Sequence, residues 1–241
     1  MIPIVGLPTW RPHRSDLAKR VAIILPLHQA KGNAAVRPDL KEQRDFLFRA
    51  YFGADRDLVG RFVSRAYRDM NRTLRGIQRR EDAAEILEGA KEKLRDFLNE
   101  LVNRRVPTNA TELAAAFDQW HRDSCDRLIC YYTDLLVPFP FSYGQAQKWI
   151  NMTFKYYWFF GEEDVSWLHP WFPVAHVPVD DFILRAVANE GVAERPRRTW
   201  SSWNDREGYQ AFQKTIREYA ASRQKIPLAL ESQWWLRYGS I

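Results

Sequence analysis

The sequence predicts an all-α fold with two lobes at most. Apolar residues return every three or four positions over most of the chain, as in amphipathic helices, and strand-like alternation is scarce. Serine, aspartate and proline stand where helices are expected to begin or end. The 241 residues suit one large domain or two small ones, and a hydrophobic fraction of 46% excludes disorder as the main state.

We expect one helical domain over 1–241, in four parts. Scattered Pro and Gly predict an irregular arm over 1–36, and helical periodicity defines a lobe over 37–137. The segment RGIQRRED at 75–82 is expected to be a solvated loop, with a basic DNA contact as the lesser possibility. The expected helices of the lobe cover residues 39–52, 57–74, 85–101 and 111–132.

The hairpin and catalytic region over 138–190 opens with a Pro-rich turn. Ser142 and Gln145 form an S-x-x-Q capping box, which predicts a helix over 145–160 that is apolar on most sides and ends at Gly161. A loop rich in Trp, His and Pro follows at 166–179. Two further helices are expected at 206–223 and 226–238, in a C-terminal region over 205–241.

Composition favours a nucleic-acid partner. Lys and Arg number 36 against 30 Asp and Glu, a formal charge of +6, and the chain holds 10 Trp, 10 Tyr and 14 Phe. Cations meet phosphates and rings stack on bases. The alternative is a modest charge excess spread over solvated helix faces. Eight of the ten tryptophans lie from residue 149 onward, so the aromatic residues are more concentrated in one part of the chain than the positive charges are.

Other classes are disfavoured. No apolar run approaches the roughly 20 residues of a membrane helix, and the N-terminus lacks the order of a signal peptide, so we expect a soluble, cytoplasmic monomer. Two cysteines, Cys125 and Cys130, and five scattered histidines exclude a disulfide framework and any metal site of familiar spacing. No metal or cofactor is expected.

Lys148 breaks the local pattern, because it lies inside the apolar helix. Burial lowers the pKa of a lysine and leaves the free amine nucleophilic near neutral pH. The alternative is a lysine that extends its ammonium to the surface or pairs with a carboxylate.

Asp180 is the second such position. An Asp at a helix N-cap accepts amide hydrogens and is usually structural, with Asp181 then the first residue of the helix. An ionised carboxylate beside a cavity also suits the stabilisation of a cationic transition state, or proton removal from a nucleophile.

The segment HVPVDDFILR resembles the P-V-D-x-x-[IV]-x-R segment of helix-hairpin-helix DNA glycosylases. The resemblance places Asp180 on the catalytic aspartate of that family and Arg185 on its arginine. Lys148 precedes Asp180 by 32 positions and Lys155 by 25. The longer gap, and the segment GQAQKWINMTFKYY, look like the lysine-bearing helix of the archaeal 8-oxoguanine DNA glycosylase branch, with Lys148 as the nucleophile.

The resemblance implies a two-lobed helix-hairpin-helix glycosylase-like fold and a set of base contacts. Two side chains sandwich the flipped base in that branch, and Met152, where the branch has an aromatic residue, and Trp234 or Trp235 stand at the matching positions. Glu231 falls where an acidic base-reading residue lies. Gln147 is expected to contact the substrate, and Gly144, Lys155 and Arg185 the DNA.

Two departures affect these expectations. The Gly-rich hairpin of the family is replaced by VPFPFSYG, with Gly144 as its one glycine, which leaves phosphate binding to the arginines. Met152 leaves the excised base open, and the rings of the Trp-rich segments could serve a bulkier base or simply pack in the core. Those rings belong to Trp167, Trp171, Phe172, Trp200 and Trp203.

The predicted function is therefore a DNA glycosylase that flips a damaged or modified base out of double-stranded DNA and cleaves its N-glycosidic bond. Attack by Lys148 would add β-elimination lyase activity. One alternative is an anti-phage defence glycosylase that excises a modified phage base. The alternative of another class is a non-catalytic helical module that binds nucleic acid or protein.

Overall fold

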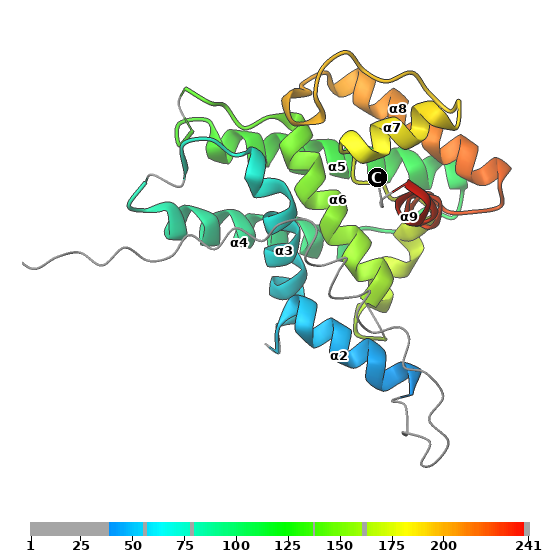
Figure 1. Cartoon of the computed structure of the whole chain (residues 1–241), viewed down its shortest axis with the longest axis horizontal. Coiled ribbons are helices and arrows are strands. Elements are labelled where there is room, and N and C mark those ends of the chain that lie inside the picture. The colour runs from blue at the N-terminus through cyan, green and yellow to red at the C-terminus, as the bar shows by residue number, and fades with distance from the viewer. Residues whose placement is uncertain (1–38, 55–56, 78–79, 137, 161–162, 239–241) are drawn as a thin grey trace, which may run out of the picture. The chain divides into compact units, whose positions relative to one another are not determined.

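The computed structural model describes residues 39–54, 57–77, 80–136, 138–160 and 163–238, and these residues form helices with no strand among them (Figure 1). The predicted all-α class is confirmed at this level. The chain divides into two compact units, 1–44 and 45–241. The sequence predicts a single domain with an arm over 1–36. That arm, and the expected helix end at Gly161, lie outside the described residues.

The first half of the chain forms the predicted helices within a few residues of their expected ends. Helix α3 ends at Met70, earlier than expected, and one 3-10 turn, η1 (Asn71–Thr73), continues it. Asp57 caps α3 and Asn109 caps α5, each by accepting backbone amide hydrogens. The helices are α2 (Leu40–Phe52), α3 (Leu58–Met70), α4 (Ala83–Val102) and α5 (Ala110–Tyr132).

Helix α6 (Tyr143–Phe160) is the most buried element, and it packs most extensively against α3 and α5 (Figure 1). Its start is the predicted capping box. The Ser142 hydroxyl accepts from the Gln145 amide at 3.0 Å, and the Gln145 side chain accepts from the Ser142 amide at 2.9 Å. Every residue from Tyr143 to Phe154 is buried, as the apolar sequence predicts.

A run of 3-10 helix, η3 (Glu163–Val174), stands where the sequence predicts a loop. Pro170 and Pro173 lie inside it, and proline fixes φ at a value that a 3-10 turn accepts while removing a donor that an α-helix needs. The rings of the Trp-rich segments are mostly core. Trp171, Phe172, Trp200 and Trp203 are buried, and Trp167 is half-buried.

The remaining elements close over one side of α6. Helix α9 packs against α7 and α8, and also contacts η3 (Figure 1). Asp180 caps α7 and Asp181 is its first residue, as the sequence predicts. The elements are α7 (Asp181–Asn189), η4 (Trp200–Ser202), α8 (Arg206–Ser222) and α9 (Pro227–Tyr238).

Gly144 fixes the contact between α6 and the η4 turn. Its amide donates to the Trp203 carbonyl at 2.8 Å, and a Cβ at this position would overlap the Trp200 carbonyl oxygen. We expect Gly144→Ala to lower the free energy of unfolding by about 1–3 kcal/mol, the usual cost of overpacking. Urea unfolding measures it, beside Ser142→Ala, which removes the cap and the hydrogen bond from the Ser142 hydroxyl to the Ser201 carbonyl but adds no overlap, and which costs about 1–2 kcal/mol. Equal midpoints for Gly144→Ala and the wild type would contradict the contact.

Candidate active site

The structure brings Lys148 and Asp180 into direct contact. The Lys148 ammonium, on α6, lies 2.7 Å from Asp180 Oδ2 at the start of α7. The other oxygen, Oδ1, accepts the amide hydrogen of Ile183 at 2.9 Å. The lysine side chain is 7% exposed and the aspartate side chain 29% exposed, so the pair is reached from solvent through the carboxylate. Asp180 is thus both a helix cap and the partner of a buried lysine.

The surroundings keep Asp180 ionised. Burial by itself would raise the pKa of this carboxyl, but the charge and hydrogen bond of Lys148, with the Ile183 amide, lower its pKa below the ordinary value. Lys155 adds to this effect. The carboxylate is therefore available at neutral pH as a hydrogen-bond acceptor and as a negative charge.

A second lysine–carboxylate pair lies beside the first. Lys155 follows Lys148 by seven positions, two turns of α6, and so shares its face. Its ammonium lies 2.8 Å from both oxygens of Glu231 on α9, whose side chain is 2% exposed. Burial raises the pKa of Glu231 while Lys155 and Lys148 oppose that rise. We call Lys148, Asp180, Lys155 and Glu231 the four-charge cluster.

Gln147 holds the backbone that presents Asp180. Its side-chain amide donates to the Val179 carbonyl at 2.9 Å and accepts from the Val179 amide at 3.1 Å. The same side chain also donates to Gly144 and accepts from Asn151. These bonds engage the whole amide of Gln147 within the protein. The residue expected to contact substrate therefore has a positioning role in this structure.

Behind that backbone lies a buried polar network that sequence reasoning missed. Asn151 Nδ2 donates to the Val177 carbonyl at 3.0 Å, and Asn151 Oδ1 accepts a hydrogen bond from His121 Nε2 at 2.9 Å. His176 lies 2.8 Å from Asp118, which Arg217 also binds. Burial lowers the pKa of both histidines, although Asp118 opposes this at His176. The histidines are scattered in the sequence, and polar residues on the buried face of α6 were the available signal.

The two candidate tryptophans differ in accessibility. Trp234 is buried and stacks on Tyr219, whereas Trp235 is 53% exposed. The Trp235 ring centroid lies 6.0 Å from the Lys155 ammonium, and the exposed Phe159 ring lies 5.9 Å from it. An open aromatic surface therefore adjoins the four-charge cluster on α6 and α9, and only Trp235 of the two tryptophans contributes to it.

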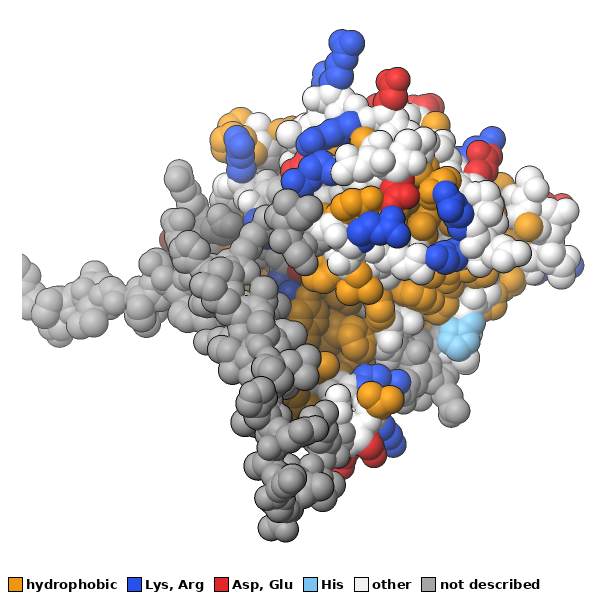
Figure 2. Space-filling view, turned by 45° about the vertical axis from the view of Figure 1, so that its right-hand side comes forward, with side chains coloured by type: hydrophobic (Ala, Val, Ile, Leu, Met, Phe, Trp, Pro, Cys, Tyr) orange, Lys and Arg blue, Asp and Glu red, His pale blue; other side chains and the backbone are white. Residues whose placement is uncertain are grey.

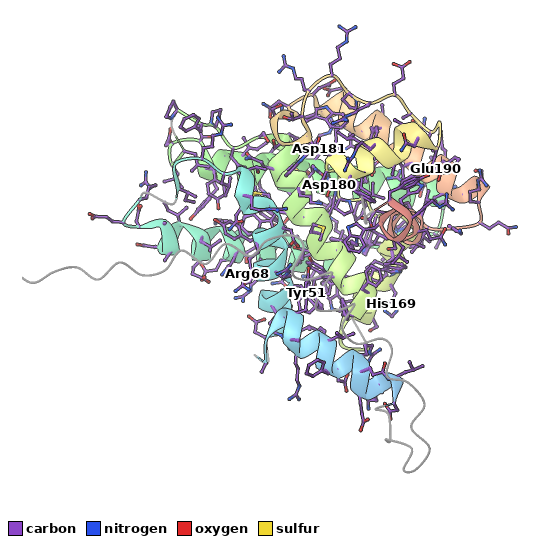
Figure 3. All side chains as sticks on the ribbon, viewed as in Figure 1. Tyr51, Arg68, His169, Asp180, Asp181 and Glu190 are labelled. Carbon is purple, nitrogen blue, oxygen red and sulfur yellow. The ribbon has the colours of Figure 1, made fainter. Side chains whose placement is uncertain are left out.

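The other predicted site residues also divide into buried and exposed ones. Met152 is buried, one turn after Lys148. Gly144 is buried with its amide bonded to Trp203, so this amide is not free for a DNA phosphate. Arg185 is exposed on α7, the helix whose first turn carries Asp180 and Asp181 in Figure 3. Figure 2 shows Lys and Arg side chains beside apolar ones on one face of the molecule.

No protein-family model, curated protein or solved structure matches the chain. Within the described ranges, each helix is too short or too polar to cross a lipid bilayer. These ranges also bring together no group of three or more His, Cys, Asp or Glu side chains that could hold a metal ion.

The lowered pKa of Asp180 predicts a pH-dependent contribution to stability. A carboxyl with a depressed folded-state pKa stabilises the fold above its unfolded value, near 3.8, and this contribution disappears as pH falls through the folded value. Asp180→Asn keeps an N-cap side chain but loses the charge. We expect it to be less stable than the wild type by up to about 3 kcal/mol at pH 7, with the difference narrowing below pH 4.

Urea unfolding at several pH values measures this difference. Asp181→Asn is the matched control, because Asp181 is exposed and its 3.2 Å pair with Arg195 is also exposed. Exposed pairs contribute roughly 0–1 kcal/mol, so this variant should follow the wild type. A difference for Asp180→Asn that stays constant from pH 7 to pH 3 would contradict the charged pair.

Proposed function

We propose that the chain is a DNA glycosylase of the helix-hairpin-helix type, with Lys148 as the nucleophile and Asp180 as its acid–base partner. The observation that carries this proposal is the 2.7 Å contact between the Lys148 ammonium and Asp180 Oδ2, at a helix N-cap that is open to solvent on the carboxylate side. The resemblance of the Asp180 segment and of the Lys148 helix to that family suggests the two-lobed fold and the class of substrate.

The proposed reaction uses only these two groups. Lys148 gives a proton to Asp180, and its free amine attacks C1′ of the flipped nucleotide. The glycosidic C–N bond breaks, and the base leaves with the bonding electrons and takes the proton from Asp180, which is ionised again. A proton of the Lys148 nitrogen moves to O4′ as the sugar ring opens to a protonated Schiff base, whose positive charge the Asp180 carboxylate stabilises. Asp180 then accepts a C2′ proton as the 3′ phosphate leaves with the electrons of the C3′–O bond.

The aromatic surface beside Lys155 supports a base-binding role. A flipped base needs a stacking partner and polar groups that read its edge. Trp235 and Phe159 offer exposed rings, and Lys155 offers a donor. Glu231 is buried and pairs with Lys155 through both of its oxygens, so it holds the Lys155 donor in place beside these rings. These groups are the proposed specificity site, and they fit repair of a damaged base or excision of a modified phage base alike.

The rival of another class is a helical binding module in which the Lys148–Asp180 pair is structural. A trapping experiment separates the two. We expect sodium borohydride to trap a covalent adduct between the wild-type protein and duplex DNA that holds the excised base, or an abasic site. Lys148→Gln should abolish the adduct, because glutamine can still donate to Asp180 but has no nucleophilic amine.

Lys155→Gln is the matched control, since it makes the same replacement on the same helix at the second pair. On duplex DNA that holds an abasic site, where no base is read, it should keep the adduct, which would locate the nucleophile at Lys148. An adduct that persists in Lys148→Gln and disappears in Lys155→Gln would move the chemistry to Lys155. No adduct from the wild type on any base of a broad panel, or on an abasic site, would favour the binding module.

The two adjacent tryptophans give a second test. Trp235→Ala removes an exposed ring, so we expect little change in stability but weaker binding of a base-bearing substrate, by about 1–3 kcal/mol for a lost stacking contact. Trp234→Ala removes a buried ring and should cost about 3–5 kcal/mol of unfolding free energy. Thermal unfolding and single-turnover titrations measure both. Unchanged substrate binding in Trp235→Ala would remove this residue from the base site.

A further inference from the structure

A basic groove lies between α3 and α4, with Tyr51 and Phe52 at its edge. Its volume is about 330 Å³. In Figure 3 the labelled Tyr51 and Arg68 lie well apart from Asp180, and no residue of the four-charge cluster lines the groove. Five cationic side chains line it, namely Arg61, Arg65, Arg68, Lys91 and Arg95.

The side chains that line the groove include more cations than carboxylates. Asp57 and Glu88 are the acidic residues among its lining. Glu88 pairs with Lys91 at 2.7 Å, and Asp57 pairs with Arg95. Arg61, Arg65 and Arg68 lie along one face of α3, and Arg61 donates hydrogen bonds to the Phe52 and Gly53 carbonyls. Arg65 also meets Asp69 at 3.3 Å, which offsets part of its charge.

The arginines are held in place by aromatic residues. The Arg65 guanidinium lies 3.8 Å from the Tyr51 ring centroid and donates to the Tyr51 hydroxyl at 2.6 Å. The Arg61 guanidinium lies 4.3 Å from the Phe48 ring centroid. Stacking of this kind fixes the planar fork of arginine, so less freedom is lost when it binds an anion.

Several donors of the groove residues lack acceptors in the described part of the chain. Arg65 Nε and Arg95 Nε are buried and make no hydrogen bond there. Arg68 is exposed and has no hydrogen bond or ion pair with the described residues. A buried donor without an acceptor is unfavourable, so a bound acceptor would relieve that cost.

We propose that this groove is a binding site for a phosphate group. Phosphate offers several acceptor oxygens to arginine forks and matches the excess positive charge. Such a group could belong to a DNA backbone or to a small phosphorylated ligand, and the chemistry of recognition is the same for both. This site goes beyond the proposed function, because it uses none of the residues of the four-charge cluster.

The test compares Arg68→Ala with Arg105→Ala. Both remove one exposed arginine and the same charge, but Arg105 does not line the groove. Arg68 makes no contact that the fold needs among the described residues, so the variant should unfold at the temperature of the wild type. One arm measures binding of an undamaged 20-base-pair duplex by anisotropy over a range of salt concentrations. The other measures binding of inorganic pyrophosphate by calorimetry.

We expect Arg68→Ala to weaken one of the two ligands at least fivefold, with Arg105→Ala close to the wild type. Loss in the duplex arm, with a salt slope lower by about 1, assigns the groove to a DNA phosphate. Loss in the pyrophosphate arm assigns it to a small phosphorylated ligand. The proposal is overturned if the wild type binds neither ligand, or if Arg68→Ala and Arg105→Ala behave alike in both arms.

The adduct assay separates this result from the proposed glycosylase chemistry. At saturating DNA, Arg68→Ala should still form the Lys148 adduct if both proposals hold. A phosphate effect without any wild-type adduct would leave the groove in place and reject the glycosylase. An adduct from the wild type, without any effect of Arg68→Ala on phosphate binding, would support the glycosylase and reject the groove.

Discussion

The burial of α6 is the constraint on which the rest of the structure depends. A helix that is buried from Tyr143 to Phe154 must find a partner for every polar side chain it carries, because an unpaired buried polar group is costly. Gln147 and Asn151 meet that need by binding the backbone at Val177 and Val179. The extended segment before α7 is thereby fixed against α6, and Asp180 arrives at Lys148 as the next residue of that segment. The ion pair is a consequence of how the helix satisfies its neutral polar groups.

The two lysine–carboxylate pairs on one face of α6 differ in how deeply their carboxylates are buried. Glu231 is nearly inaccessible and its pKa is raised by burial, so it favours the protonated form more than a surface glutamate does. Asp180 keeps a lowered pKa and an exposed edge. A proton acceptor that a substrate must approach needs the second set of properties. The exposed rings of Trp235 and Phe159, in contrast, lie beside Lys155. The Lys155–Glu231 pair therefore adjoins an aromatic surface, whereas the neighbouring Lys148–Asp180 pair has the properties that proton transfer needs.

Sequence patterns anticipated the local features of this site better than its long-range contacts. The capping box at Ser142 and the cap at Asp180 depend on residues three positions apart, and both were predicted correctly. The contact between Lys148 and Asp180 crosses 32 positions, and it was expected only through a family resemblance. Trp234 and Trp235 could not be told apart, because adjacent residues differ by about 100° around a helix and the rotation of α9 is set by its packing on α7 and α8. The positioning role of Gln147 and the contacts of the buried histidines also depend on how distant segments pack together, which a sequence pattern does not give.

The groove between α3 and α4 is tied to α6 as well. Tyr156, on α6, donates to Asp69 and lies 3.2 Å from the Tyr51 hydroxyl, and both of these residues contact Arg65. Burial raises the pKa of Tyr156, so its hydroxyl stays protonated and remains a donor at physiological pH. Lys155 and Tyr156 are adjacent, but they lie on different faces of the helix, one toward α9 and the other toward α3. One buried helix thus orients the lysines of the candidate active site on one side and an arginine of the basic groove on the other.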